Sequence, residues 1–150
     1  MNMAYTVRNE KETEVFAGEI AKLAYPGCVI CLIGDLGVGK TTMTKGIAKA
    51  LGVTEQITSP TFTIVQEYET GRLPFYHFDV YRVNDPDELF EMGFEEYLHG
   101  KGVSVIEWAD LIQDILPEKR IEVRIERSEF PGATEDERLI SLDMKGEEAR

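Results

Sequence analysis

Residues 34–41 constrain the fold of this chain more than any other segment, because they match a motif that has a fixed structural context. They read Gly-Asp-Leu-Gly-Val-Gly-Lys-Thr and fit the spacing G-x-x-x-x-G-K-[ST] without a gap. The glycines let the backbone curl so that successive N–H groups point at one phosphate, and the dipole of the following helix adds to the attraction. An apolar run precedes the motif, and apolar residues at helical spacing follow it. The segment therefore predicts a strand, a phosphate-binding loop (P-loop) and a helix in succession.

The last residues of the motif have separate expected roles. Lys40 can reach the β- and γ-phosphates of a nucleoside triphosphate, the Thr41 hydroxyl can ligate Mg²⁺, and Thr42 is placed to bond an α-phosphate oxygen. A glycine turn with a surface lysine would explain none of this spacing. We therefore expect Mg-ATP to bind on Gly34, Asp35, Leu36, Gly37, Val38, Gly39, Lys40, Thr41 and Thr42.

The rest of the chain alternates predicted strands and helices, which indicates an α/β sheet. Asn9 and Glu12 resemble a capping box at the start of a first helix. Predicted strands cover residues 29–33, 62–68, 73–82, 103–107, 120–126 and 139–144, and short helices cover residues 85–97 and 111–116. We expect one P-loop NTPase domain over residues 1–150, with a mixed, mostly parallel sheet flanked by helices and an antiparallel hairpin over residues 62–82.

Two acidic residues at predicted strand ends are candidate partners for the metal. Asp79 stands where an apolar stretch gives out, as a Walker B aspartate does, although a strand-end acid that faces water is the simpler alternative. Glu107 ends the strand 103–107, and ligand sites in open α/β sheets lie beyond the carboxyl ends of strands. There Glu107 can orient or activate water, or hold Mg²⁺, and the sequence leaves these roles open.

Four other residues have weaker functional arguments. Thr61 lies in a layout of loop, hairpin and acid that resembles the switch region of small GTPases, so it is a candidate sensor of the γ-phosphate, with a turn hydroxyl as the alternative. Trp108 can cover the site or dock a partner, but core packing is the simpler expectation. His77 is expected to be a packed, hydrogen-bonded histidine, and His99 to be solvated in a loop.

The charge balance argues against direct binding of nucleic acid. The chain carries 16 Lys and Arg against 28 Asp and Glu, a net charge of −12, and its basic residues form no cluster. A protein that grips nucleic acid unaided needs a cationic footprint that neutralises phosphates. If RNA is involved, we expect another protein to hold it. Charge that only keeps the chain soluble is an equally good explanation.

The chain is expected to be cytoplasmic and to have no contact with membranes. No apolar run approaches the ~20 residues that a membrane span needs, and the first residues lack the basic-then-apolar pattern of a signal peptide. Cys28 and Cys31 form C-x-x-C within a predicted strand, where residues three apart point to opposite faces. Two buried structural thiols are therefore expected, rather than a zinc or redox site.

Five segments carry a combined pattern: GDLGVGKTT, SPTFT, FYHFDVYR, ELFEMGFEEYL and VIEWAD. In order and spacing, from the first helix to about Pro117, the chain resembles the TsaE (YjeE) family of bacterial ATPases that are needed for threonylcarbamoyladenosine modification of tRNA. Val38 is one small departure, since the family more often has Ala or Ser there, and the tail from Arg127 carries no matching motif.

The resemblance implies a P-loop fold that binds ATP rather than GTP, and the sequence has no N-K-x-D guanine signature. It also implies that adenine lies near the start of the first helix, around residues 10–13. It implies that Thr41 and Glu107 bind Mg²⁺, with Asp79, a further candidate metal ligand, and Thr61 in supporting roles. The candidate catalytic residues are then Glu107, Lys40 and Thr61, and Glu10 and Trp108 join the P-loop in nucleotide binding.

Protein partners are also implied by the resemblance. In the family, the ATPase binds a complex of TsaB and TsaD, of which TsaD is the threonylcarbamoyl transferase, and ATP hydrolysis is thought to reset that complex between cycles. This chain would then reach tRNA only indirectly, and its ATPase activity would be weak without the partners.

Two alternatives to a partner-dependent ATPase remain. A small P-loop kinase acting on a metabolite usually carries an Arg-rich lid, whereas the arginines here are scattered at positions such as Arg72, Arg82 and Arg124. A nucleotide-binding regulator that never hydrolyses ATP is the second alternative, and Glu107 argues mildly against it.

Overall fold

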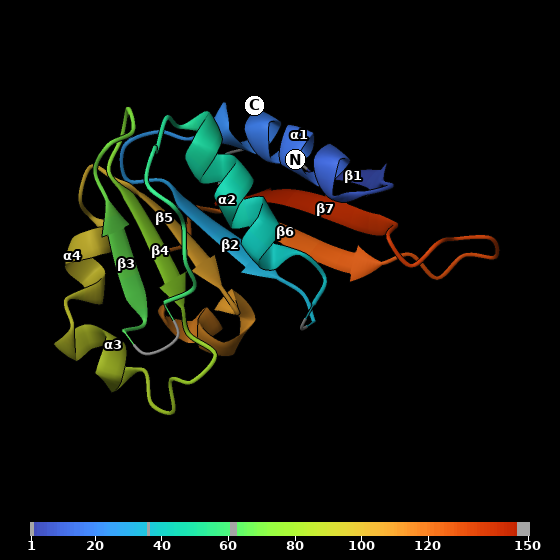
Figure 1. The fold of residues 1–150 in the computed structure, drawn as a ribbon. Helices are drawn as coiled ribbons and strands as arrows, with labels where there is room; N and C mark the ends of the chain where they lie inside the picture. The colour runs from blue at the N-terminus through green and yellow to red at the C-terminus, as the bar shows by residue number, and fades with distance from the viewer. Residues whose placement is uncertain (1, 36, 61–62, 147–150) are drawn as a thin grey trace.

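The computed structural model describes residues 2–35, 37–60 and 63–146, and its centre is one seven-stranded sheet in the order β1-β7-β6-β2-β5-β4-β3 (Figure 1). The strands are β1 (Asn2–Val7), β2 (Val29–Ile33), β3 (Val65–Tyr68), β4 (Phe75–Asp79), β5 (Val103–Glu107), β6 (Arg120–Arg127) and β7 (Arg138–Lys145). The helices are α1 (Glu10–Ala21), α2 (Lys40–Ala50), α3 (Asp87–Glu91), α4 (Phe94–Leu98) and the 3₁₀ helix η1 (Ala109–Ile115).

Parallel pairing is confined to the centre of the sheet. β6, β2, β5 and β4 are parallel neighbours, whereas β3 pairs with β4, and β7 with both β6 and β1, in the antiparallel direction. All residues of β2 and β5 are buried, as expected for parallel strands that are covered on both faces. The predicted α/β fold with a mixed sheet and an antiparallel hairpin is confirmed.

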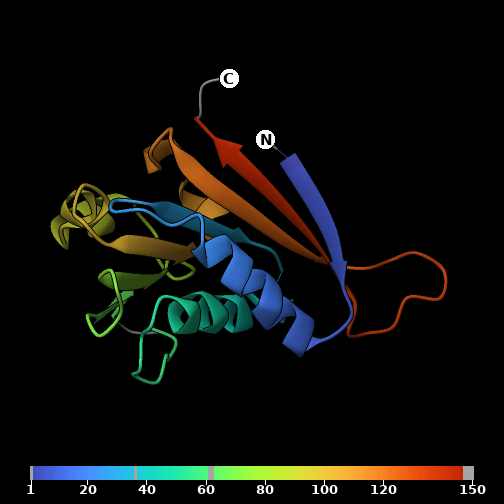
Figure 2. The same cartoon turned by 90° about the horizontal axis from the view of Figure 1, so that it is seen from above.

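The two faces of the sheet carry separate hydrophobic cores. On one face, α1 and α2 lie side by side (Figure 2). Met43 and Ile47 of α2 belong to the same core as Ile30 of β2. On the other face, Phe78 of β4 packs with Phe94 of α4 at a centroid distance of 5.4 Å. Within the described residues, no helix combines the length and the hydropathy that a membrane span requires.

Cys28 and Cys31 belong to different cores, one on each face of the sheet. Both thiols are free and buried, and burial raises the pKa of Cys28 and raises the pKa of Cys31 to about 12. A thiol with a raised pKa stays protonated and unreactive near neutral pH. The expectation of two structural thiols is confirmed.

A close contact between α1 and α2 sets the position of the first helix relative to the P-loop. Asn9 caps α1 by accepting a hydrogen bond of 2.9 Å from the backbone N–H of Glu12, as predicted. Gly46 of α2 faces Ala17 of α1, and a Cβ at Gly46 would lie 2.6 Å from the Ala17 Cβ. The two helices therefore approach closely at Gly46. Their first turns are neighbours as well, because the Thr42 hydroxyl donates a hydrogen bond to Glu10.

Three local features differ from the sequence prediction. One helix was expected over residues 85–97, but Gly93, with a φ of 87°, separates α3 from α4. The helix after β5 is a 3₁₀ helix that begins earlier than expected, at Ala109. Strand β1 was not predicted, although Met3, Tyr5 and Val7 alternate along it and lie on the side of the first core and α1. In addition, β3 and β4 are shorter than the predicted strands 62–68 and 73–82, and Phe62 lies outside the described residues.

Candidate nucleotide-binding site

The P-loop joins the buried strand β2 to α2, in the context that the motif predicts. Gly37 and Gly39 have φ values of 80° and 109°, a left-handed backbone conformation that glycine adopts without strain. Gly34 is needed for a different reason, because a Cβ there would lie 2.4 Å from the carbonyl oxygen of Ile125 in β6. The neighbouring strand therefore limits the side chain at the start of the loop. Leu36 lies outside the described residues.

Lys40 is buried at the first position of α2, with 5% of its surface exposed. Its ammonium group donates hydrogen bonds to the carbonyl oxygens of Gly34 and Asp35, the second at 2.9 Å, and lies 3.8 Å from the centroid of the Trp108 ring. Burial lowers the pKa of Lys40, while nearby carboxylates, Glu107 first, oppose that shift. These hydrogen bonds go to uncharged carbonyls, so the ammonium group can exchange them for a phosphate oxygen.

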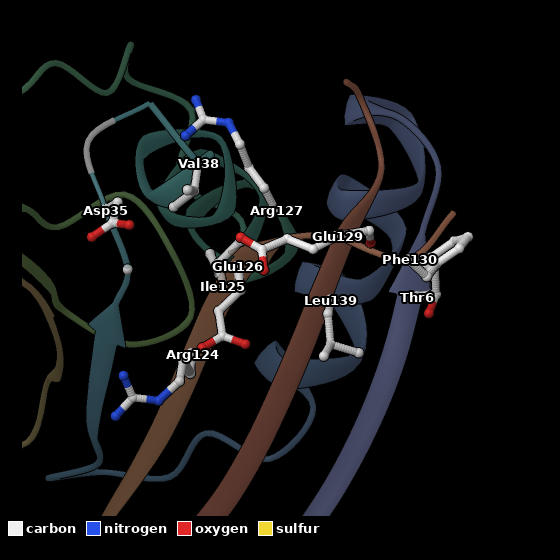
Figure 3. Close-up of a pocket in the computed structure, with 12 residues that line it drawn as sticks. Thr6, Asp35, Val38, Arg124, Ile125, Glu126, Arg127, Glu129, Phe130 and Leu139 are labelled. Carbon is white, nitrogen blue, oxygen red and sulfur yellow. The ribbon is translucent and has the colours of Figure 1, made fainter. Parts of the chain in front are cut away.

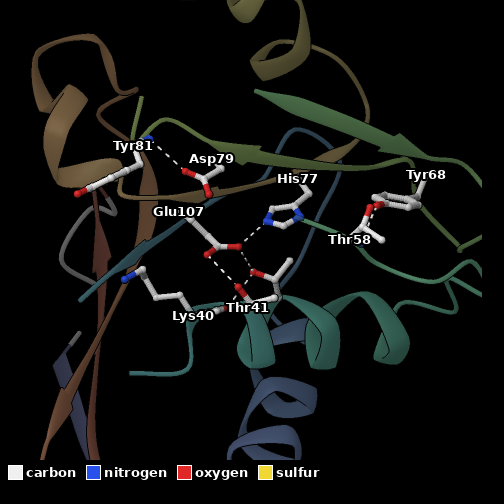
Figure 4. A network of polar contacts seen from close by, with 9 residues as sticks. Lys40, Thr41, Thr58, Tyr68, His77, Asp79, Tyr81 and Glu107 are labelled. Atoms are coloured by element: carbon white, nitrogen blue, oxygen red, sulfur yellow. Dashed lines mark hydrogen bonds and ion pairs between the residues drawn. The ribbon is translucent and has the colours of Figure 1, made fainter. Parts of the chain in front are cut away.

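Three side chains bind the carboxylate of Glu107, which is buried at the end of β5 (Figure 4). The Thr41 hydroxyl donates to Oε1 at 3.4 Å, and the Thr44 hydroxyl lies 3.3 Å from Oε2. His77 of β4 places its Nε2 atom 2.5 Å from the same Oε2. The threonine expected to ligate Mg²⁺ and the acid at the end of β5 are therefore direct neighbours.

Asp79 lies one strand farther from the P-loop than Glu107 does. The two acids are register partners at the ends of β4 and β5, and β5 is the strand that adjoins β2. Asp79 Oδ1 accepts a hydrogen bond of 3.0 Å from the backbone N–H of Tyr81. The structure thus brings Glu107, rather than Asp79, into contact with Thr41. Asp79 and Glu107 nevertheless both line a cavity beside the P-loop.

Glu10, Thr42 and Trp108 also line this cavity. The Thr42 hydroxyl donates a hydrogen bond of 3.1 Å to Glu10, which places the start of α1 at the site. Trp108 has a φ of 64°, and its ring lies 4.6 Å from that of Tyr81. Non-glycine residues with such a backbone are uncommon, and they concentrate at functional sites. The partly buried Trp108 ring packs against the second core and also covers Lys40.

The cavity has a volume of about 380 Å³ and is lined by Glu10, Gly37, Gly39, Lys40, Thr41, Thr42, Ser59, Asp79, Glu107 and Trp108. A larger cavity of about 590 Å³ lies between the P-loop and the ends of β6 and β7 (Figure 3). That second cavity is lined by Gly34, Asp35 and Val38 but not by Lys40, Thr41 or Glu107. The chemistry expected for phosphate binding is therefore in the smaller cavity. Thr61 lies outside the described residues, and His99 is exposed and does not line the smaller cavity.

The donor set suits Mg²⁺ bound together with phosphate. Mg²⁺ is usually held through one or two carboxylates, substrate phosphates and water, rather than by an all-protein cage. Here the Thr41 hydroxyl and the carboxylates of Glu107 and Asp79 supply oxygen atoms around one cavity. Within the described part of the chain, no group of three or more His, Cys, Asp or Glu side chains forms a metal site by itself. A divalent ion at this site would therefore need phosphate oxygens of a bound nucleotide as ligands, in addition to those of the protein.

Two residues that contact Glu107, His77 and Thr44, were not predicted as site residues from the sequence. His77 is hydrogen-bonded as expected, but its partner depends on the register of β4 against β5, which no local pattern shows. Thr44 follows Lys40 by four residues, so it lies on the same face of α2. That helical spacing was the available signal for Thr44.

Comparison with known proteins decides the family. The family model described as "Threonylcarbamoyl adenosine biosynthesis protein TsaE" matches residues 7–137, which is most of the chain. This chain belongs to the TsaE family. The family resemblance carried by the five sequence segments is therefore confirmed.

Relatives and a solved structure agree with TsaE membership over nearly the whole chain. A protein of Bacillus subtilis named "tRNA threonylcarbamoyladenosine biosynthesis protein TsaE" is 49% identical over 138 residues, covering 92% of this chain and 83% of that protein. A protein of the same name from Rickettsia felis is 38% identical over 144 residues, covering 95% and 81%. The crystal structure of Bacillus subtilis YdiB matches with a TM-score of 0.82 at 42% identity, covering 97% of this chain and 87% of the other.

Proposed function

We propose that this chain is a Mg²⁺-dependent ATPase of tRNA threonylcarbamoyladenosine biosynthesis. The pathway follows from TsaE family membership and from the names of the curated relatives. The observation that carries the ATPase proposal is that Lys40, Thr41 and Glu107 line one cavity at the carboxyl ends of parallel strands. A cation for the phosphates, a hydroxyl for the metal and a buried carboxylate are the parts that phosphoryl transfer to water requires.

Residues 34–42 bind the phosphates in this proposal. The left-handed backbone at Gly37 and Gly39 leads into the N-terminus of α2, where unpaired N–H groups attract anions. Lys40 replaces its carbonyl partners with phosphate oxygens, because hydrogen bonds between charged groups are the stronger ones. Glu10 and Trp108, which line the cavity, contact the nucleotide in this proposal.

Mg²⁺, when bound with ATP, neutralises charge that develops on the phosphates. Thr41 and Glu107 hold the ion, and Asp79 supports it from the next strand. Glu107 has a second role, which is to orient or activate the attacking water from the buried end of β5. Thr61 remains the candidate sensor of the γ-phosphate.

The hydrolysis cycle serves a protein complex in this proposal. TsaB and TsaD are the proposed partners, and ATP hydrolysis resets their transferase complex between cycles. A net charge of −12 suits contact with protein better than direct contact with tRNA, which the chain reaches through the complex. A nucleotide site that another protein completes turns over slowly by itself. A role in tRNA modification also makes the cytoplasm the compartment in which we expect this chain.

Steady-state ATP hydrolysis, measured with the chain alone and with purified TsaB–TsaD complex, tests this function. We expect slow, Mg²⁺-dependent turnover alone and a rise of at least about tenfold with the complex, by analogy with NTPases completed in trans. A Lys40→Ala variant mixed with the same complex is the control for contaminating ATPases. Brisk turnover that the complex leaves unchanged would contradict the partner proposal and favour a kinase acting on a metabolite. Absence of turnover in both samples would refute the ATPase proposal.

A further inference from the structure

The two oxygens of the Glu107 carboxylate have different hydrogen-bond partners, and only Oε1 contacts Thr41 of the P-loop. Oε2 lies 2.5 Å from His77 Nε2 and 3.3 Å from the Thr44 hydroxyl, whereas Oε1 faces Thr41 at 3.4 Å. Both His77 and Thr44 have no exposed surface. The two oxygens of this carboxylate therefore have different environments.

A count of the available hydrogen-bond donors and acceptors identifies His77 as the main donor to Glu107 Oε2. The Thr44 hydroxyl has one hydrogen, and it also lies 3.0 Å from the carbonyl oxygen of Lys40, so that hydrogen is divided between two acceptors. His77 Nδ1 is buried without a hydrogen-bond partner in the described structure. If the ring hydrogen is on Nε2 and not on Nδ1, no buried N–H group of the ring lacks an acceptor, so this tautomer has the lower free energy. His77 Nε2–H then donates to Glu107.

Strand register explains why the donor is a histidine. His77 pairs with Val105, two positions before the register pair of Asp79 and Glu107, so His77 and Glu107 are diagonal neighbours on adjacent strands. Diagonal neighbours on adjacent strands are within reach of each other only through aromatic or long side chains. The imidazole Nε2 reaches Glu107, whereas an asparagine amide would stop one atom short.

We propose that His77 is a positioning residue that fixes the orientation of Glu107, so that Oε1 faces Thr41 and the nucleotide cavity. This inference rests on the proposed ATPase function. His77 does not line the cavity, so it acts through Glu107 and not on the nucleotide. Without it, the carboxylate can rotate and leave its proposed place beside the metal and the attacking water.

The test compares His77→Gln with His77→Asn. The Gln side chain carries its amide nitrogen as many bonds from Cβ as His Nε2, whereas Asn carries it one bond nearer. We expect His77→Asn to lower kcat about tenfold with the KM for ATP unchanged, the usual size of an outer-sphere effect, and His77→Gln to restore most of that loss. In a Glu107→Gln background, His77→Asn should cause no further loss. Equal kcat values for parent and His77→Asn would overturn the proposal, as would equal losses in both single variants.

Binding gives a readout that does not depend on turnover. We expect the Mg²⁺ concentration for half-maximal thermal stabilisation by a non-hydrolysable ATP analogue to rise about tenfold in His77→Asn and to stay near the parent value in His77→Gln. At saturating Mg²⁺, affinity for the analogue should be the same in all three proteins, because the P-loop is intact. An unchanged Mg²⁺ requirement in a folded His77→Asn variant would contradict the proposal.

NMR of the parent protein keeps the proposal testable if His77→Asn does not fold. The chain has 2 histidines, so ¹⁵N-histidine labelling gives two rings to assign. We expect the hydrogen of the His77 ring on Nε2, and its presence on Nδ1 alone would overturn the proposal. This measurement needs no nucleotide. A parent protein that shows the Nε2 hydrogen but no ATP hydrolysis would refute the ATPase function and not the contact.

Discussion

Lys40 of the P-loop and Glu107 line the same cavity. The contacts of the P-loop differ in range from those of the Glu107 cluster, which is Glu107 with Thr41, Thr44 and His77. Lys40 of the P-loop binds Gly34, a partner six residues earlier in the chain. Glu107 binds Thr41, 66 residues earlier, and His77, 30 residues earlier. The loop is therefore shaped by consecutive residues, whereas the cluster depends on how β4, β5 and α2 come together.

This difference in range separates the two proposed functions of the site, phosphate binding and ATP hydrolysis. The local part carries the backbone N–H groups and the cation that bind phosphates, and the long-range part carries the carboxylate that acts in hydrolysis. Substitutions in the loop should therefore weaken nucleotide binding, and substitutions in the cluster should lower turnover while nucleotide binding remains. The experiments below test this division.

Lys40→Ala should have the largest effect. Removing the ammonium group leaves the β- and γ-phosphates without their cationic partner, so we expect ATP affinity to fall at least about a hundredfold, on the scale of a buried charge pair. The measurement is the shift in melting temperature with Mg-ATP, which should vanish. A shift equal to that of the parent would remove the phosphate-loop argument.

Gly34→Ala should have the next largest effect, through the backbone. The added Cβ would lie 2.4 Å from the carbonyl oxygen of Ile125, so β6 or the loop has to move at a cost of about 1–3 kcal/mol. We expect a lower melting temperature and weaker ATP binding by calorimetry.

Gly18→Ala is the matched control for Gly34→Ala. Gly18 lies within α1, and a Cβ there has nothing within 4 Å, so alanine should stabilise the helix by about 0.5–1 kcal/mol. If Gly34→Ala binds ATP as the parent does, the contact between β6 and the loop does not shape the site.

Asp79→Asn should have a smaller effect than any change at Glu107. The substitution keeps an acceptor oxygen for the Tyr81 N–H and removes only the charge, one strand away from Thr41. We expect turnover to fall several-fold, about 1 kcal/mol in barrier height, with ATP affinity unchanged. A loss as large as that of Glu107→Gln would mean that Asp79, and not Glu107, is the main carboxylate of the site.

The smallest expected effect is a change in the fluorescence of Trp108, the single tryptophan of the chain. The Lys40 ammonium group lies over its ring at 3.8 Å, and phosphate binding draws that group away from the ring. Mg-ATP should therefore change the emission of the parent protein and leave that of Lys40→Ala unchanged. An identical response in both proteins would separate Trp108 from the lysine.

The same contrast in range explains how much of the molecule the sequence could predict. β2 and α2 were predicted because their signals, an apolar run and helical spacing, are contained in consecutive residues. β1 was missed because it is an edge strand held by β7, more than a hundred residues later in the chain. Met3, Tyr5 and Val7 do alternate with Asn2, Ala4 and Thr6, but six residues are a short signal.

Residues of the candidate site follow the same rule. Lys40 and Thr41 could be assigned from motif spacing alone, whereas the contact of Glu107 with His77 required the register of β4 against β5. Asp79 and Glu107 are both acids at predicted strand ends, and their local sequences do not distinguish them, although the family resemblance gave Asp79 the supporting role. Only the strand order shows that the strand of Glu107 adjoins β2.

Glu107→Gln, with ATP affinity and turnover measured on the same sample, tests the central claim most directly. Gln keeps the shape of the side chain and removes the charge. We expect ATP affinity at saturating Mg²⁺ within about threefold of the parent, less than 1 kcal/mol, and turnover at least about a hundredfold lower. Hydrolysis at the parent rate would show that Glu107 has no catalytic role, and loss of ATP binding would contradict the division between loop and cluster.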